Sequence, residues 1–225
     1  MSTTGERVAK VPFHFLGCWE LREVLGRRAF DERELLEHLE EVPLDSIYFH
    51  TQSVLLRERV FPGRYPNDFA TWAAVQVRDE VLGEKLGVID PQGYPDLESL
   101  RAEVVSLIDD HLAQLTLVPR VIFGAPFYFV QSRVLEIPTG VKVRSLTEFR
   151  DALATVDTAV VYLHVVEARG RRGRRRNDFA AWVDEQLGLP ELAAKMARLN
   201  PFPLGLEEMR RRLLALCGES LGEAP

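Results

Sequence analysis

Two histidines in this chain, His50 and His164, stand in matching surroundings and could take part in acid–base or metal chemistry. Each follows a tyrosine by two positions and precedes a repeated Asn-Asp-Phe-Ala-x-Trp string, which contains Asp68 or Asp178. An aspartate can orient an imidazole for proton transfer or metal binding, so these four residues form the candidate catalytic set. The same contact could instead anchor a helix start, since a buried imidazole needs hydrogen-bond partners. We favour the anchoring role, because duplication preserves folding determinants at least as readily as sites.

The surroundings match because one sequence unit occurs twice. The matching strings are Pro-Phe-His-Phe at 12–15 with Pro-Phe-Tyr-Phe at 126–129, and Asn-Asp-Phe-Ala-Thr-Trp at 67–72 with Asn-Asp-Phe-Ala-Ala-Trp at 177–182. The first pair stands 114 positions apart (126 − 12) and the second pair 110 (177 − 67), because the loop after the second histidine is four residues shorter. We expect residues 1–119 to be the first copy and residues 120–225 to be the second.

Each copy is predicted to open with a β-strand. Aromatic and β-branched residues dominate the opening runs, Val11–Leu21 and Val121–Ile137, and such residues are typical of strands. An unpaired strand edge invites aggregation, and pairing the two opening strands would hide both edges. We therefore expect these strands to pair with each other.

Helices are predicted to make up the rest of each copy. Capping boxes, Asp31 with Glu34 and Ser145 with Glu148, precede apolar positions at helical spacing. The histidine segments are also predicted to be helical, and a further helix begins at each Asn-Asp pair. The tryptophans of these last helices, at 72 and 182, are expected in the core. The predicted fold class is α+β, mostly α, with two tandem copies of a small strand-plus-helices unit packed with pseudo-twofold symmetry.

Arginines crowd the loop between each histidine and the following Asn-Asp pair. The second copy carries Arg169, Arg171, Arg172, Arg174, Arg175 and Arg176 before Asn177, and the first carries Arg57, Arg59 and Arg64 before Asn67. Guanidinium groups suit phosphates and carboxylates, and a helix N-terminus adds amides and a favourable dipole. This pattern predicts an anion site at each helix start, for a sugar phosphate, a nucleotide or an acidic partner segment. The alternative is a solvated loop whose charges repel one another.

No metal site and no cofactor are predicted. The other histidines, His14, His38 and His111, do not recur in the second copy, and Asp109, Asp110 and His111 are expected on a solvated helix face. The chain contains no His-Glu-x-x-His string, no closely spaced cysteine pair and no glycine-rich phosphate loop. These absences lower the odds of a P-loop or Rossmann enzyme and leave less stereotyped sites open.

Composition limits the classes of binding partner and the cellular compartment that we expect. A formal net charge of −6 argues against a surface built for nucleic acid or anionic membranes, and we expect neither as a partner. The two cysteines form no disulfide framework, and the first eleven residues lack the apolar core of a signal peptide. We expect a soluble cytoplasmic protein.

The repeated motifs also resemble a known family. Tyr-x-His, then Asn-Asp-Phe-Ala-x-Trp, then Leu-x-x-Lys-[Leu/Met] and an Asx-Pro stop are similar to an uncharacterised prokaryotic family, domain of unknown function 5752. The resemblance extends from Phe13 to about Leu216. It implies a prokaryotic, soluble protein without an assigned activity, and it transfers no catalytic residues to this chain.

Three classes of function remain open from the sequence. The favoured hypothesis is a non-catalytic binding or regulatory module for an anionic small molecule or acidic partner at the arginine loops. The second is a hydrolase or transferase for a phosphorylated or sugar-like substrate, with His50 or His164 as acid–base. The third is a scaffold or oligomerisation protein. Whether the chain is an enzyme, and its oligomeric state, are left undecided.

Overall fold

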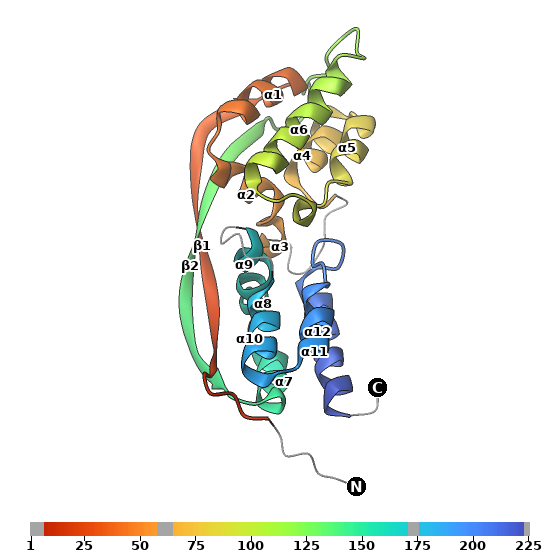
Figure 1. Cartoon of the computed structure of the whole chain (residues 1–225). Coiled ribbons are helices and arrows are strands. Elements are labelled where there is room, and N and C mark those ends of the chain that lie inside the picture. Colours follow the sequence, from red (N-terminus) through yellow and green to blue (C-terminus); the bar gives the residue numbers. More distant parts are fainter. Residues whose placement is uncertain (1–6, 58–64, 171–175, 223–225) are drawn as a thin grey trace. The chain divides into compact units, whose positions relative to one another are not determined.

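The computed structural model describes residues 7–57, 65–170 and 176–222, and combines one two-stranded sheet with many helices (Figure 1). The fold is α+β and mostly α, as predicted. The chain divides into two compact units. Unit 1 comprises Met1–Trp19 with Leu135–Pro225, and unit 2 comprises Glu20–Val134.

The sheet is built from the two opening strands. β1, Phe13–Ala29, pairs with β2, Phe127–Val143, in antiparallel orientation. The predicted pairing of these strands is therefore confirmed, although both strands begin and end later in the chain than the sequence indicated. The start of β1 and the end of β2 belong to unit 1, and the remainder of both strands belongs to unit 2.

Unit 2 combines its part of the sheet with helices. In chain order these are α1 (Glu32–Glu41), α2 (Leu44–Thr51), α3 (Val54–Arg57), α4 (Asp68–Trp72), the π-helix η1 (Ala73–Val77), α5 (Glu80–Gly87), the 3₁₀ turn η2 (Pro91–Gly93) and α6 (Leu97–Leu112). The long helix α6 packs against α1, α2 and α5. Its apolar stripe, Leu100, Val104 and Ile108, is buried in the core of this unit.

The helices of unit 1 follow the same order along the chain as those of unit 2. They are α7 (Leu146–Thr155), α8 (Thr158–Val161), the π-helix η3 (Tyr162–Glu167), α9 (Ala168–Gly170), α10 (Asp178–Leu187), α11 (Pro190–Ala197) and α12 (Leu206–Leu221). Helix α12 packs against α7, α8 and α11. Its buried positions, Met209, Leu213 and Cys217, lie 109 residues after those of α6 (209 − 100).

The predicted helix caps form as the sequence indicated. Asp31 and Ser145 accept hydrogen bonds from the amides three residues on, at the starts of α1 and α7. Glu34 and Glu148 reach back one residue past the caps and accept from the amides of Phe30 and Arg144, a variant of the predicted capping boxes. The histidine segments are helical, as predicted.

The compact units do not coincide with the two sequence copies, which we expect to meet at residues 119 and 120. Phe13 opens the first copy, yet its ring lies 5.4 Å from that of Phe179 and 5.6 Å from that of Trp182 in unit 1. Phe127 opens the second copy, and its ring lies 5.2 Å from that of Phe69 in unit 2. Each unit thus takes its aromatic strand from one copy and its helices from the other.

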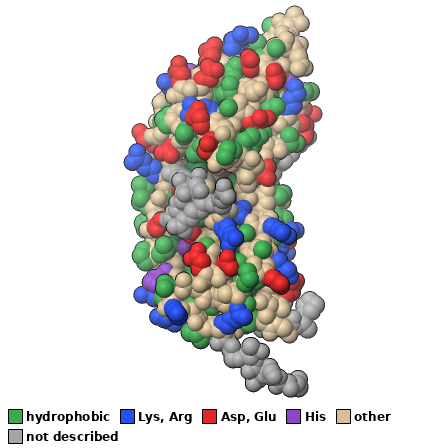
Figure 2. Space-filling view, viewed as in Figure 1, with side chains coloured by type: hydrophobic (Ala, Val, Ile, Leu, Met, Phe, Trp, Pro, Cys, Tyr) green, Lys and Arg blue, Asp and Glu red, His purple; other side chains and the backbone are tan. Residues whose placement is uncertain are grey.

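The tryptophans are core residues, as predicted. Trp72 and Trp182 are buried, and their indole N–H groups donate to the backbone oxygens of Ala125 and Val11. Acidic and basic side chains are interspersed on the face drawn in Figure 2. Among the described residues, no helix has the length and apolar character needed to cross a membrane.

Candidate functional site

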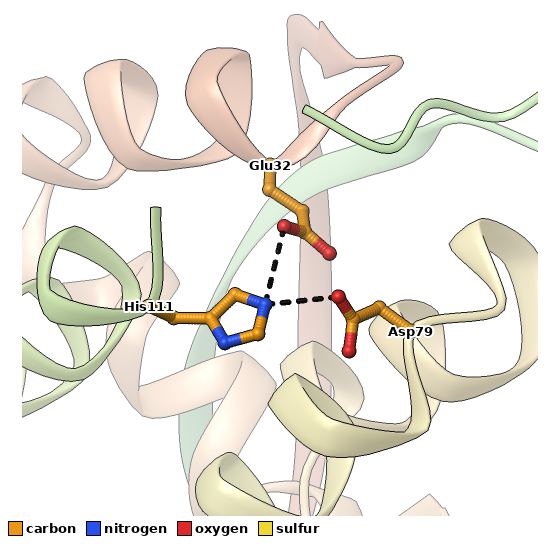
Figure 3. Close-up of side chains that lie close together, drawn as sticks. All are labelled: Glu32, Asp79 and His111. Carbon is orange, nitrogen blue, oxygen red and sulfur yellow. Dashed lines mark hydrogen bonds and ion pairs between the residues drawn. The ribbon is translucent and has the colours of Figure 1, made fainter. Parts of the chain in front are cut away.

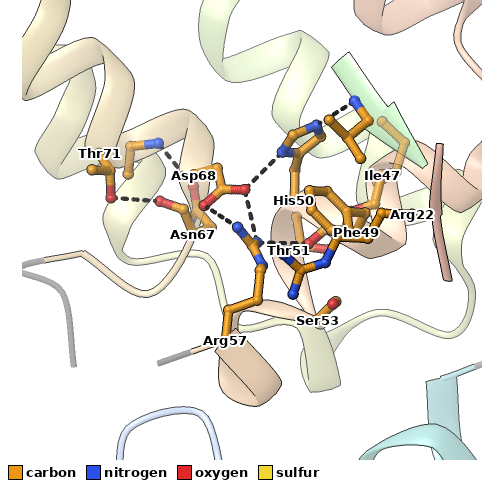
Figure 4. A network of polar contacts seen from close by, with 12 residues as sticks. Arg22, Ile47, Phe49, His50, Thr51, Ser53, Arg57, Asn67, Asp68 and Thr71 are labelled. Atoms are coloured by element: carbon orange, nitrogen blue, oxygen red, sulfur yellow. Dashed lines mark hydrogen bonds and ion pairs between the residues drawn. The ribbon is translucent and has the colours of Figure 1, made fainter. Parts of the chain in front are cut away.

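His50, on α2, is buried and held from both sides of its ring (Figure 4). Its Nδ1 lies 2.7 Å from Oδ2 of Asp68, the first residue of α4. Its Nε2 accepts a hydrogen bond of 3.1 Å from the backbone N–H of Val130 in β2. The imidazole therefore joins α2, the start of α4 and the sheet.

His164, on η3, makes the same pair of contacts in unit 1. Its Nδ1 lies 3.0 Å from Oδ2 of Asp178, the first residue of α10. Its Nε2 accepts a hydrogen bond of 3.0 Å from the backbone N–H of Leu16 in β1. The contact that the sequence predicts between histidine and aspartate is thus present in both copies.

These contacts define the protonation of each ring. A backbone N–H can only donate, so Nε2 must present its lone pair and Nδ1 must carry the proton that is donated to the aspartate. Burial lowers the pKa of His50 and outweighs the opposing effect of the Asp68 carboxylate, which agrees with a neutral imidazole. With both nitrogens engaged, neither ring presents a lone pair to a metal or a proton to a substrate.

Arg57 turns inward onto the same aspartate. Its Nη2 lies 2.8 Å from Oδ2 of Asp68 and donates to the backbone oxygen of Phe49 at 3.0 Å. The guanidinium also stacks over the Phe49 ring, 4.3 Å from its centroid. Burial raises the pKa of Asp68, but hydrogen bonds and charge from His50 and Arg57 outweigh it and leave that pKa below its usual value. Arg57 is therefore engaged in the fold and does not point toward an external anion.

Asn67 and Asn177 are buried helix caps. The side-chain oxygens accept from the amides of Ala70 and Ala180, three residues on. The side-chain nitrogens donate to backbone oxygens of α5 and α11, at Leu86 and Met196. In each side-chain amide, both the oxygen and the nitrogen are thus hydrogen-bonded. This explains why asparagine recurs at the position.

Of the other arginines in the arginine-rich loops, the structure describes Arg169 and Arg176. Arg176 is exposed and forms an ion pair of 2.6 Å with Asp184. Arg169 donates to the backbone oxygen of Ala197. Six further candidates lie outside the described residues: Arg59, Arg64, Arg171, Arg172, Arg174 and Arg175.

Sequence reasoning missed a third cluster, formed by Glu32, Asp79 and His111 in unit 2 (Figure 3). Nε2 of His111 lies 2.9 Å from Oδ2 of Asp79 and 3.8 Å from Oε2 of Glu32. The prediction that His111 occupies a solvated helix face is wrong, because the residue is 4% exposed. It lies in the last turn of α6, on the side that packs against α1 and α5.

Glu32 is the unusual member of the cluster. It is 0% exposed, and neither of its carboxyl oxygens has a hydrogen-bond partner among the described residues. Burial, reinforced by the charges of Asp79 and Asp31, raises its pKa to about 8. One sequence signal could have drawn attention to it: the second copy has an apolar residue, Leu146, at the aligned position, directly after the cap that matches Asp31.

Comparison with known proteins identifies a matching family and a similar solved structure. A family model described as "Family of unknown function (DUF5752)" matches residues 10–218. The solved structure titled "The structure of OrfY from Thermoproteus tenax" is similar with a TM-score of 0.78 and 27% sequence identity, over 94% of this chain and 96% of that chain. Comparison with curated proteins found no match.

Proposed function

Because this chain belongs to the family of unknown function DUF5752, which brings no activity with it, we propose its function from the contacts: it is a non-catalytic binding or regulatory module. The observation that carries the proposal is the double engagement of His50 and His164, each bonded at Nδ1 to an aspartate and at Nε2 to a backbone amide. A general base needs a lone pair directed at its substrate. The candidate catalytic set is therefore better explained as two structural anchors.

The anchors also support a pseudo-twofold arrangement of the two sequence copies. In each case the imidazole of one copy bonds to the opening strand of the other, at Val130 or Leu16. Reciprocal exchange of this kind is expected when two equivalent units assemble around a twofold axis. A cytoplasmic location remains part of the proposal, since Cys18 and Cys217 form no disulfide with each other.

The ligand class that we propose is an anion, bound with the help of the arginine-rich segment 169–176. Six of these eight residues are arginine, a density that suits phosphate or carboxylate groups. At the start of the segment, Arg169 donates a hydrogen bond to the backbone oxygen of Ala197. Directly after its end, Asn177 is a buried helix cap. The segment thus leads directly into the start of α10, where the helix dipole favours negative charge.

A thermal-shift comparison tests this proposal. The parent and a variant with Arg171, Arg172, Arg174 and Arg175 changed to serine are screened against sugar phosphates, nucleotides and dicarboxylates, at low and moderate salt. We expect an anion to raise the melting temperature of the parent but not of the variant, with a smaller rise at moderate salt. The matched control removes the same charge at four exposed positions elsewhere: Arg28, Arg33, Arg133 and Arg211.

Two results would count against the proposal. One is that no compound shifts the melting temperature of the parent at either salt concentration. The other is that the control variant loses the response as fully as the test variant does, because total charge would then explain the effect. Turnover of a phosphorylated substrate that disappears in His50→Ala or His164→Ala, with the fold retained, would favour the enzymatic alternative.

A further inference from the structure

The cluster of Glu32, Asp79 and His111 converges from three separate helices of unit 2. Glu32 is the first residue of α1, Asp79 is the N-cap of α5, and His111 lies in the last turn of α6. One side-chain donor atom of each residue lies within 4.8 Å of those of the other two. Figure 3 shows the two carboxylates directed toward Nε2 of the imidazole. The three groups therefore face a common point.

Helix capping does not account for Glu32. The amides at the start of α1 are served by the capping box of Asp31 and Glu34. Glu32 is fully buried, and its two carboxyl oxygens lack hydrogen-bond partners within the described part of the chain. A buried carboxylate without a hydrogen-bond partner costs several kcal/mol, so such a group either holds a proton or needs a compensating positive charge close by.

The fold itself does not need these polar side chains. Aligning the two copies by their helix caps and buried stripes places Leu146, Leu189 and Ser220 opposite Glu32, Asp79 and His111. Leu189 occupies the N-cap of α11 without a side-chain cap, where Asp79 caps α5. The second copy thus builds the equivalent helices with two leucines and a serine. The acidic cluster is a feature of the first copy alone.

The donor set matches a divalent transition metal. Two carboxylates carry the charge that balances a divalent cation, and an imidazole nitrogen favours zinc-like ions over Mg²⁺ and Ca²⁺, which prefer oxygen ligands. Zinc–ligand bonds of about 2.0–2.1 Å in a tetrahedron place neighbouring donor atoms about 3.3 Å apart. The separations of 2.9 Å and 3.8 Å between His111 and the two carboxylates lie on either side of that value.

We propose that Glu32, Asp79 and His111 form a binding site for one divalent transition-metal ion of the zinc class. Three protein ligands leave a fourth position for water or for a ligand atom from outside. The site lies in unit 2 and shares no residue with the arginine segment. Its existence therefore does not depend on the anion proposal, and either can fail without the other.

Calorimetric titration of the full-length, metal-stripped protein with Zn²⁺ tests the site. We expect one ion to bind per chain, and Mg²⁺ and Ca²⁺ to bind more weakly. Glu32→Gln, Asp79→Asn and His111→Gln each remove one ligand, and Asp79→Asn keeps the side-chain oxygen that caps α5. Each is expected to raise the Kd beyond the roughly 10- to 100-fold that loss of an outer-shell partner costs. His14→Gln, which alters an exposed histidine, is the control and should leave binding unchanged.

Circular dichroism of each variant separates loss of the site from loss of the fold. Any one folded variant is enough to decide the outcome, and Co²⁺ absorption of the parent reports independently whether nitrogen and oxygen ligands surround the ion. Loss of binding in the folded variants, with retention in His14→Gln, supports the site. Absence of one-to-one binding by the parent, or equal binding by parent and variants, overturns it. Tighter binding of Mg²⁺ or Ca²⁺ than of Zn²⁺ overturns the assignment of metal class.

Discussion

The buried carboxyl of Glu32 should make the stability of the metal-free protein depend on pH. Its pKa is about 8 in the folded protein and 4.5 for an unperturbed glutamate, so the folded state holds this proton more tightly than the unfolded state. The unfolding free energy contributed by the group is fully present below pH 4.5 and is lost as the pH rises through about 8. At 1.36 kcal/mol for each pH unit, that interval amounts to roughly 5 kcal/mol.

Glu32→Gln removes this titration and keeps the shape of the side chain. We therefore expect the variant to gain stability relative to the parent as pH rises, with the difference between them growing by roughly 4 kcal/mol between pH 5 and pH 9. The nearby groups Asp31, Asp79 and His111 remain in both proteins. The change with pH in the difference between the two curves therefore reports chiefly on Glu32.

Urea denaturation in the presence of EDTA, at intervals from pH 5 to pH 9, measures the difference. Glu37→Gln is the matched control, because it makes the same change at an exposed position of the same helix. It should follow the parent throughout. Parallel curves for the parent and Glu32→Gln would refute the reasoning, because they would mean that Glu32 has the same pKa in the folded and unfolded states.

Two further predictions concern the packing of each unit. Replacing His50 or His164 by alanine should lower the unfolding free energy by about 2–4 kcal/mol, because a buried N–H and an aspartate each lose a partner. Urea denaturation checks this against His14→Ala, and variants as stable as the parent would contradict the anchoring role. Gly83→Ala should destabilise by about 1–2 kcal/mol despite its better helix propensity, because the new methyl would lie 2.6 Å from Cβ of Ala74. A higher denaturation midpoint than that of the parent would show instead that the neighbouring backbone around Ala74 moves enough to accommodate the methyl group.

Local features of the fold could be predicted from the sequence because their signals lie within a few residues. The capping boxes at Asp31 and Ser145 depend on a partner three residues away, and both form as the spacing indicates. The Asn caps at 67 and 177 obey the same rule. The His–Asp contacts could also be anticipated, because both members recur together in the repeat.

Long-range arrangement could not be predicted in the same way. The pairing of the two opening strands was expected, but an aromatic strand that packs against the helices of its own copy and one that packs against those of the other copy have the same apolar pattern, so the sequence does not distinguish them. The structure decides in favour of exchange, with Phe13 packed against Phe179 and Phe127 packed against Phe69. The second contact to each histidine, from Leu16 or Val130, follows from that exchange.

The sequence by itself therefore determined the repeat, the helix starts and the pairing of each histidine with its aspartate. The helix caps depend on hydrogen bonds between residues a few positions apart, and the histidine and aspartate recur together in the repeated motif, so both can be recognised from the order of residues alone. Only the tertiary structure decided that Glu32, Asp79 and His111 meet. They lie on three helices far apart in the chain, and no spacing rule connects them. Their chemistry arises from burial, since a carboxylate removed from water without a hydrogen-bond partner must be protonated or balanced by positive charge, whereas the same residue on a solvated surface is stabilised by water.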